Sequence, residues 1–116
     1  MASRTKLELA VNILRHLAIV DAQETPAAID TQYVIARYED CLAELADNDL
    51  SYWPSDQIPV VIFEPLTQLV ALSCGPAFGI AVSPQDMENG GIMYRRRLRR
   101  HGGKKSSGLP AETENF

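Results

Sequence analysis

Residues 60–74 in the middle of the chain restrict the fold more than any other segment. They read VVIFEPLTQLVALSC, and as a helix they would carry apolar side chains on nearly every side. A helix that is apolar all round has to be enclosed by other elements, so we expect this one at the centre of the molecule. Pro59 would lie in its first turn, and Pro65 would bend the helix or mark its true start.

Residues 60–63 also fit a short strand, with Pro65 then starting the helix. We prefer a helix over the whole segment because no second strand is evident as a partner. A lone strand would leave its backbone hydrogen bonds unsatisfied.

A first helix is predicted to begin at Thr5. The sequence Thr5-Lys-Leu-Glu8 fits a capping box, in which each side chain satisfies the free backbone N–H of the other residue. Apolar residues then recur at helical spacing and would form one core face, namely Leu7, Val11, Leu14 and either Leu17 or Ala18.

The second and longest helix is predicted to begin at Thr25-Pro26 and to run to about Ala46. Threonine would cap the helix, and proline would occupy the first helical position, where its missing N–H costs nothing. Its inner face would consist of Thr31, Val34, Tyr38, Cys41 or Leu42, and Leu45.

The connector of residues 51–59 holds the single tryptophan, Trp53. It either plugs the edge of the core where the connector crosses the helices or contacts a partner, since tryptophan often anchors interfaces. Gly75-Pro76 should end the central helix.

A fourth helix should start at Ser83-Pro84 and run toward Arg100. Its core face would consist of Met87, Gly91, Tyr94 and Leu98. Gly90-Gly91 either breaks this helix or permits a close approach to another backbone.

Positive charge is concentrated near the C-terminus. Through Tyr94 the chain has four basic and 13 acidic residues, whereas the segment from Arg95 to Lys105 has seven basic residues and no acid. These basic residues are Arg95, Arg96, Arg97, Arg99, Arg100, Lys104 and Lys105. A run this dense exceeds what the helix dipole favours at a C-terminus, so we expect it to contact an acidic protein surface or nucleic acid.

The sequence contains no recognisable catalytic or cofactor motif. There is no phosphate loop and no metal-ligand spacing, and Cys41 and Cys74 fit buried, reduced thiols. We therefore expect no enzyme, no cofactor and no metal. The apolar runs fall short of the roughly 18 residues that a spanning helix needs, which predicts a soluble protein without membrane contact.

Together these patterns predict an all-α protein, a small four-helix bundle with an extended basic C-terminal arm. Residues 1–100 would form the helical domain. Residues 101–116 would form a flexible arm whose apolar side chains, Leu109 and Phe116, could dock on a partner.

The chain also resembles the head-to-tail adaptors of tailed bacteriophages, known as head completion proteins or tail accessory factors. The resemblance covers residues 5–100 and lies in the TKLEL start of the first helix, in the segment from Leu17 to Asp21, and in the long helix that follows. It continues in Ile58-Pro59, which opens the buried helix, and in GPAFG, which ends it. Pro65 and Gly90-Gly91 depart from the family pattern.

The resemblance implies a structural virion protein of the head-tail neck. Such adaptors are assembled in the host cytoplasm and add to the portal ring after DNA packaging, usually in twelve copies. The resulting collar retains the DNA that lies in its channel and receives the tail or a further neck protein. A C-terminal arm fixes each copy to the portal, and by position that role falls here on the seven basic residues and more weakly on Leu109 and Phe116. The alternative is a small helical nucleic-acid-binding protein that uses residues 95–105.

Overall fold

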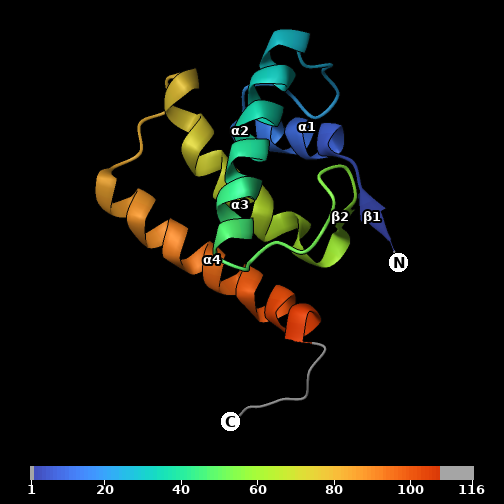
Figure 1. Cartoon of the computed structure of the whole chain (residues 1–116). Coiled ribbons are helices and arrows are strands. Elements are labelled where there is room, and N and C mark those ends of the chain that lie inside the picture. The colour runs from blue at the N-terminus through green and yellow to red at the C-terminus, as the bar shows by residue number, and fades with distance from the viewer. Residues whose placement is uncertain (1, 108–116) are drawn as a thin grey trace.

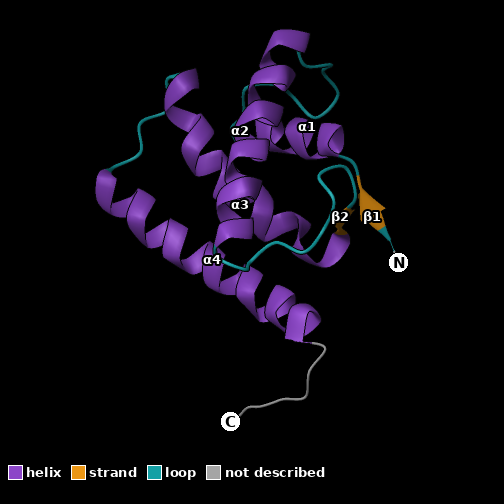
Figure 2. Cartoon of the chain, in the orientation of Figure 1, coloured by secondary structure: helices purple, strands orange, loops and turns teal. Residues whose placement is uncertain are grey.

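The computed structural model describes the backbone of residues 2–107 and the side chains of residues 2–101. Four α-helices account for most of it: α1 (Lys6–His16), α2 (Ala28–Asp47), α3 (Phe63–Cys74) and α4 (Pro84–Ser107). Two 3-10 turns, η1 (Val60–Ile62) and η2 (Gly75–Phe78), flank α3. The predominantly helical architecture predicted from the sequence is therefore confirmed (Figures 1 and 2).

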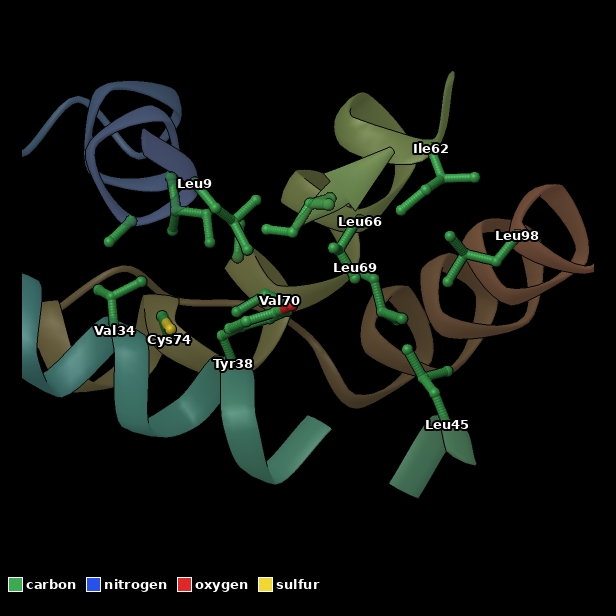
Figure 3. Packing of buried hydrophobic residues seen from close by; sticks show 14 of the residues in the cluster. Leu9, Val34, Tyr38, Leu45, Ile62, Leu66, Leu69, Val70, Cys74 and Leu98 are labelled. Atoms are coloured by element: carbon green, nitrogen blue, oxygen red, sulfur yellow. The ribbon is translucent and has the colours of Figure 1, made fainter. Parts of the chain in front are cut away.

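The central position predicted for the apolar segment is confirmed by α3. This helix contacts α1, α2 and α4, and its core residues include Leu66, Val70 and Cys74, none of which is exposed (Figure 3). By length and composition, Val60–Phe78 could also cross a membrane, contrary to our sequence expectation, although more than half of that segment is buried inside the molecule. Its apolar character is explained by the helices packed around it.

Neither prediction for residues 60–63 is fully correct. Val60–Ile62 form a 3-10 turn, and the α-helix begins at Phe63, so that Pro65 lies in its first turn and requires no kink. A two-residue strand precedes them: β2 (Ile58–Pro59) pairs antiparallel with β1 (Ser3–Arg4). The sequence does not reveal this partner because two residues are too few for an alternating pattern.

The N-terminal capping box of α1 is confirmed, with Thr5 Oγ1 accepting from the Glu8 backbone N–H at 3.1 Å and Glu8 Oε1 accepting from the Thr5 backbone N–H at 2.8 Å. The predicted core face of α1 is wrong in part, because Leu7 is 54% exposed and Val11 only partly buried. The face that packs on α2 and α3 consists of Leu9, Ala10, Ile13 and Leu14. The predicted stripe and the observed one both have helical spacing, and the positions of the neighbouring helices decide which of the two is buried.

The predicted start of α2 at Thr25-Pro26 is also wrong. The helix begins at Ala28, and Ala27 precedes it in extended conformation without a side-chain cap. Residues 25–27 belong instead to the loop that connects α1 to α2. A capping motif in the sequence does not specify how long this loop has to be. The inner face of α2 follows the prediction at Thr31, Val34, Tyr38 and Leu45, which are buried.

Helix α4 begins as predicted, with Ser83 Oγ accepting from the Asp86 backbone N–H at 3.0 Å. It continues past Arg100 to Ser107 and therefore crosses the domain boundary expected at residue 100. It also runs unbroken through Gly90-Gly91. A Cβ placed on Gly90 would lie 3.0 Å from Leu72 Cδ1, so this glycine permits the close approach of α4 to α3.

Candidate partner-binding surface

Helix α4 is fixed to the body of the protein along one side. Leu98 is 1% exposed and packs in the core, Gly91 is buried, and Tyr94 is partly buried. The helix contacts α3 and η1 on this side (Figure 3). Leu98 is the deepest of the described α4 side chains and holds the basic half of the helix against the molecule.

Two of the predicted partner-binding arginines form hydrogen bonds to the body of the protein. Arg95 Nη2 donates to Glu44 Oε1 of α2 at 3.1 Å, and Arg97 Nη1 donates to Gln68 Oε1 of α3 at 2.9 Å. Both arginines are partly buried and flank Leu98. They set the orientation of α4 and have fewer donors left for a partner.

Three other arginines share the opposite side of the helix. With 3.6 residues per turn, Arg96, Arg99 and Arg100 fall within roughly one third of the helix circumference. All three are exposed, and none of them forms an ion pair within the part of the chain that the structure describes. Because the backbone beneath them is helical, their charges are held in one row.

Two apolar residues, which were not predicted from the sequence, extend this row. Ile92 is 51% exposed and Met93 48% exposed, one turn before Arg96 on the same side. The i, i+4 spacing of Ile92 and Arg96 was the available signal. We refer to Ile92, Met93, Arg96, Arg99 and Arg100 together as the outer face of α4.

The outer face suits a partner that combines carboxylates or phosphates with an apolar contact. Each guanidinium can donate two parallel hydrogen bonds to one such anion. Ile92 and Met93 offer apolar area that becomes buried when a surface closes on them. Helix α4 therefore contacts the body of the protein through residues 95, 97 and 98 and presents the remaining arginines to solvent.

The other residues predicted for this site fall in different places. Lys104 and Lys105 belong to the backbone of α4, and their side chains lie outside the described residues, as do Leu109 and Phe116 altogether. Trp53 is only 7% exposed and donates from Nε1 to the Tyr38 hydroxyl at 3.1 Å. The structure therefore places this tryptophan in the core, which is one of the two roles considered for it.

A cleft of about 230 Å³ lies between α2, α3 and α4. Its charged groups neutralise one another, since Arg37 pairs with Asp40 at 3.5 Å and Arg95 with Glu44 at 3.1 Å. Cys41 also lines the cleft, and burial raises the pKa of its thiol to about 11. A thiol with such a pKa is protonated at neutral pH and is a poor nucleophile.

Burial likewise raises the pKa of the Cys74 thiol to about 11, and this residue is fully buried. Both cysteines are free. Over the described residues, no group of three or more His, Cys, Asp or Glu side chains could hold a metal ion.

Comparison of the chain with protein-family models, with curated proteins and with solved structures finds no match.

Proposed function

We propose that this chain is a structural assembly protein, a head-to-tail connector of a tailed bacteriophage that docks on the portal ring after DNA packaging. The observation that carries the proposal is the outer face of α4, where exposed arginines and apolar residues stand on a helix anchored to an acidic body. The resemblance of residues 5–100 to phage adaptors indicates which kind of assembly this is, namely a connector between head and tail.

In this proposal the four helices form a small bundle, and its arm is the C-terminal half of α4 together with residues 108–116. The arm docks on an acidic patch of the portal through Arg96, Arg99 and Arg100, and Lys104 and Lys105 add positive charge to the arm. Leu109 and Phe116 add apolar anchors. Arg95 and Arg97 contribute by holding α4 at its angle to the body.

Neighbouring copies of the chain form a ring on the portal, and a downstream tail or neck protein binds that ring. The function is architectural and not enzymatic: the collar in the virion neck retains packaged DNA and provides the attachment site for the tail. An acidic body suits a wall that faces DNA, because like charge keeps the nucleic acid from adhering to it.

The test is a mass determination of the purified protein, alone and mixed with the portal protein from the same genome. We expect a defined multi-copy complex with the portal. A variant with Arg96, Arg99 and Arg100 all changed to Ala should lose at least about a hundredfold in affinity, because each charge-assisted hydrogen bond contributes about 1.5 kcal/mol or more.

The matched control changes the same three arginines to Lys. It keeps the charge and loses only the paired hydrogen bonds, so it should bind more weakly than the wild type and more tightly than the Ala variant. Normal assembly of the Ala variant would contradict the role of α4, and a chain that ignores the portal would contradict the adaptor assignment.

The second candidate is a nucleic-acid-binding protein, which the exposed arginine row favours because phosphates could replace carboxylates as its ligands. Binding of DNA through three such contacts should weaken with salt at a log–log slope of roughly −3. A portal complex that also buries Ile92 and Met93 should depend less on salt. The two slopes, measured on the same preparation, distinguish the candidates.

A further inference from the structure

A groove lies between α1 and the start of α3, and none of the residues that line it belongs to α4. Its floor consists of Leu7, Val11 and Phe63, and Arg4 and Arg15 line it as well. Its volume is about 300 Å³, and it is open to solvent. Leu7 and Val11, two residues of α1 that were expected to face the core, line the groove and are exposed and partly buried there, respectively.

The groove has a net positive charge although the body is acidic. Only four basic residues precede Arg95, and two of them, Arg4 and Arg15, line the groove. The Arg4 guanidinium lies over the Phe63 ring, 5.1 Å from its centre. Arg15 is exposed and forms no ion pair with any residue that the structure describes. The acid of the groove, Glu8, accepts through Oε1 in the capping box, and its Oε2 lies 4.0 Å from Arg4 Nη1, so Arg15 carries the charge of the groove that has no counter-ion among the described residues.

The first turns of α2 form an exposed apolar ridge that has acidic residues near it, in contrast to the basic groove. Ile29 is 75% exposed, the highest value among the large apolar side chains that the structure describes, and Tyr33, one turn later, is 38% exposed. Acidic residues lie near the ridge in the sequence: Asp21 and Glu24 in the preceding loop, where Glu24 Oε1 accepts from the Asp21 backbone N–H, and Asp30 in the first turn of α2. No residue of the ridge lines the groove. In Figure 1, α2 begins at the top of the molecule, whereas β1 and the start of α1 lie at its right edge.

From this complementarity we propose that the groove of one copy receives the ridge of a second copy. Ile29 enters the apolar floor near Leu7 and Val11, and the ridge carboxylates approach Arg15 and Arg4. Two different surfaces meet in this contact, so it is a head-to-tail interface. Such an interface repeats from copy to copy and closes into a ring when the rotation between copies allows it.

This contact deepens the proposed function, since a ring on the portal would rest on it, whereas binding of a partner through α4 would not. The two can therefore fail separately. Self-association is measured without the portal, and partner binding is measured with it.

The experiment is sedimentation equilibrium of the full chain at concentrations up to about 1 mM, where even a weak contact is substantially occupied. We expect reversible association that grows with concentration. Arg15→Glu places acid against acid and Glu24→Arg places base against base, so each variant alone should associate at least about tenfold more weakly.

An equal mixture of these two variants should associate again, because the reversed groove of one then faces the reversed ridge of the other. Arg96→Glu, on the outer face of α4, changes the net charge as Arg15→Glu does and should leave association unchanged. Ile29→Ser should weaken association without a cost to folding, since this side chain is exposed. Far-UV circular dichroism checks that every variant keeps its helices.

A chain that remains monomeric throughout this range overturns the proposal, as does a mixture that fails to restore association. Loss of association on deleting residues 108–116, while Arg15→Glu and Glu24→Arg have no effect, would place the contact outside the groove and would equally overturn the proposal.

Discussion

The Tyr38 hydroxyl joins the long helix α2 to the connector that follows it. It donates to the Ser55 backbone carbonyl at 2.8 Å and accepts from Trp53 Nε1 at 3.1 Å. Tyr38 is 1% exposed, and burial raises the pKa of its hydroxyl to about 12. The hydroxyl group of Tyr38 is thus the hydrogen-bond partner of two groups of the connector, the Ser55 carbonyl and the Trp53 indole N–H.

Replacing Tyr38 by Phe should lower the free energy of unfolding by about 1–3 kcal/mol, because the change leaves a buried donor and an acceptor unpaired. Urea denaturation followed by Trp53 fluorescence measures this. Tyr33→Phe is the matched control, since Tyr33 is partly exposed, and its effect should stay within about 0.5 kcal/mol.

The same variant tests the pKa of Tyr38. The folded state holds the hydroxyl proton more tightly than the unfolded chain, whose pKa is near 10.0. Wild-type stability should therefore fall as the pH rises above 10, and this component should be absent from Tyr38→Phe. Identical pH profiles for the two proteins would contradict the hydrogen-bonded, buried hydroxyl.

The Lys6–Glu39 pair links the start of α1 to α2 and gives a prediction at low pH. Lys6 Nζ lies 3.0 Å from Glu39 Oε2, and this hydrogen bond lowers the pKa of the Glu39 carboxyl below its usual 4.5. A lowered pKa contributes stability above pH 4.5 that is lost as the pH falls through the folded value. Glu39→Gln should therefore be less stable than the wild type at pH 7 and equally stable at pH 2. Thermal denaturation at the two pH values, with and without salt, measures the difference.

At the scale of elements, α4 shows how two adjacent glycines differ. A Cβ on Gly90 would lie 3.0 Å from Leu72 Cδ1 of α3, whereas a Cβ on Gly91 would find only Arg95 Nη1 at 3.5 Å, an ordinary contact. The close packing of α4 on α3 thus depends on the first glycine. The second lowers the stability of the helix without an evident packing reason.

Gly91→Ala should raise the free energy of unfolding by about 0.5–1 kcal/mol, because alanine favours the helix and nothing opposes its methyl group. Gly90→Ala should gain less or lose stability, since Leu72 must first move. Chemical denaturation of both variants gives the comparison, and a larger gain at Gly90 than at Gly91 would contradict the close contact with Leu72.

Taken as a whole, the molecule has one core. Buried residues of α1, α2, α3 and the connector pack together with Leu98 of α4 (Figure 3). Trp53 reports on this core, while far-UV circular dichroism reports on all helices, including the long and partly exposed α4.

The two signals should change in one coincident transition during urea unfolding, because Leu98, Arg95 and Arg97 couple α4 to the core. Leu98→Ala should cost about 2–5 kcal/mol and should move both signals together. Loss of helical signal before the Trp53 transition would mean that α4 unfolds separately from the body.

Features that depend on residues within one helical turn could be predicted from the sequence alone. The capping box at Thr5 and the cap at Ser83 were predictable because each joins residues three apart, and no other element takes part. The central position of α3 followed from apolar residues on all its sides. These signals are local or belong to a single helix, so they are independent of how the helices are placed.

Features that compare distant segments were decided by the tertiary structure. The sequence offered two apolar stripes on α1, and the position of α2 and α3 buried Leu9 and left Leu7 outside. The pairing of β1 with β2 joins segments more than fifty residues apart, a distance over which no pattern reaches. The basic run was visible in the sequence, but the burial of Leu98 turned Arg95 and Arg97 inward and Arg96 outward. The physical reason is the same each time: a side chain's surroundings depend on which neighbouring element packs beside it, and the chain's own order does not specify that neighbour.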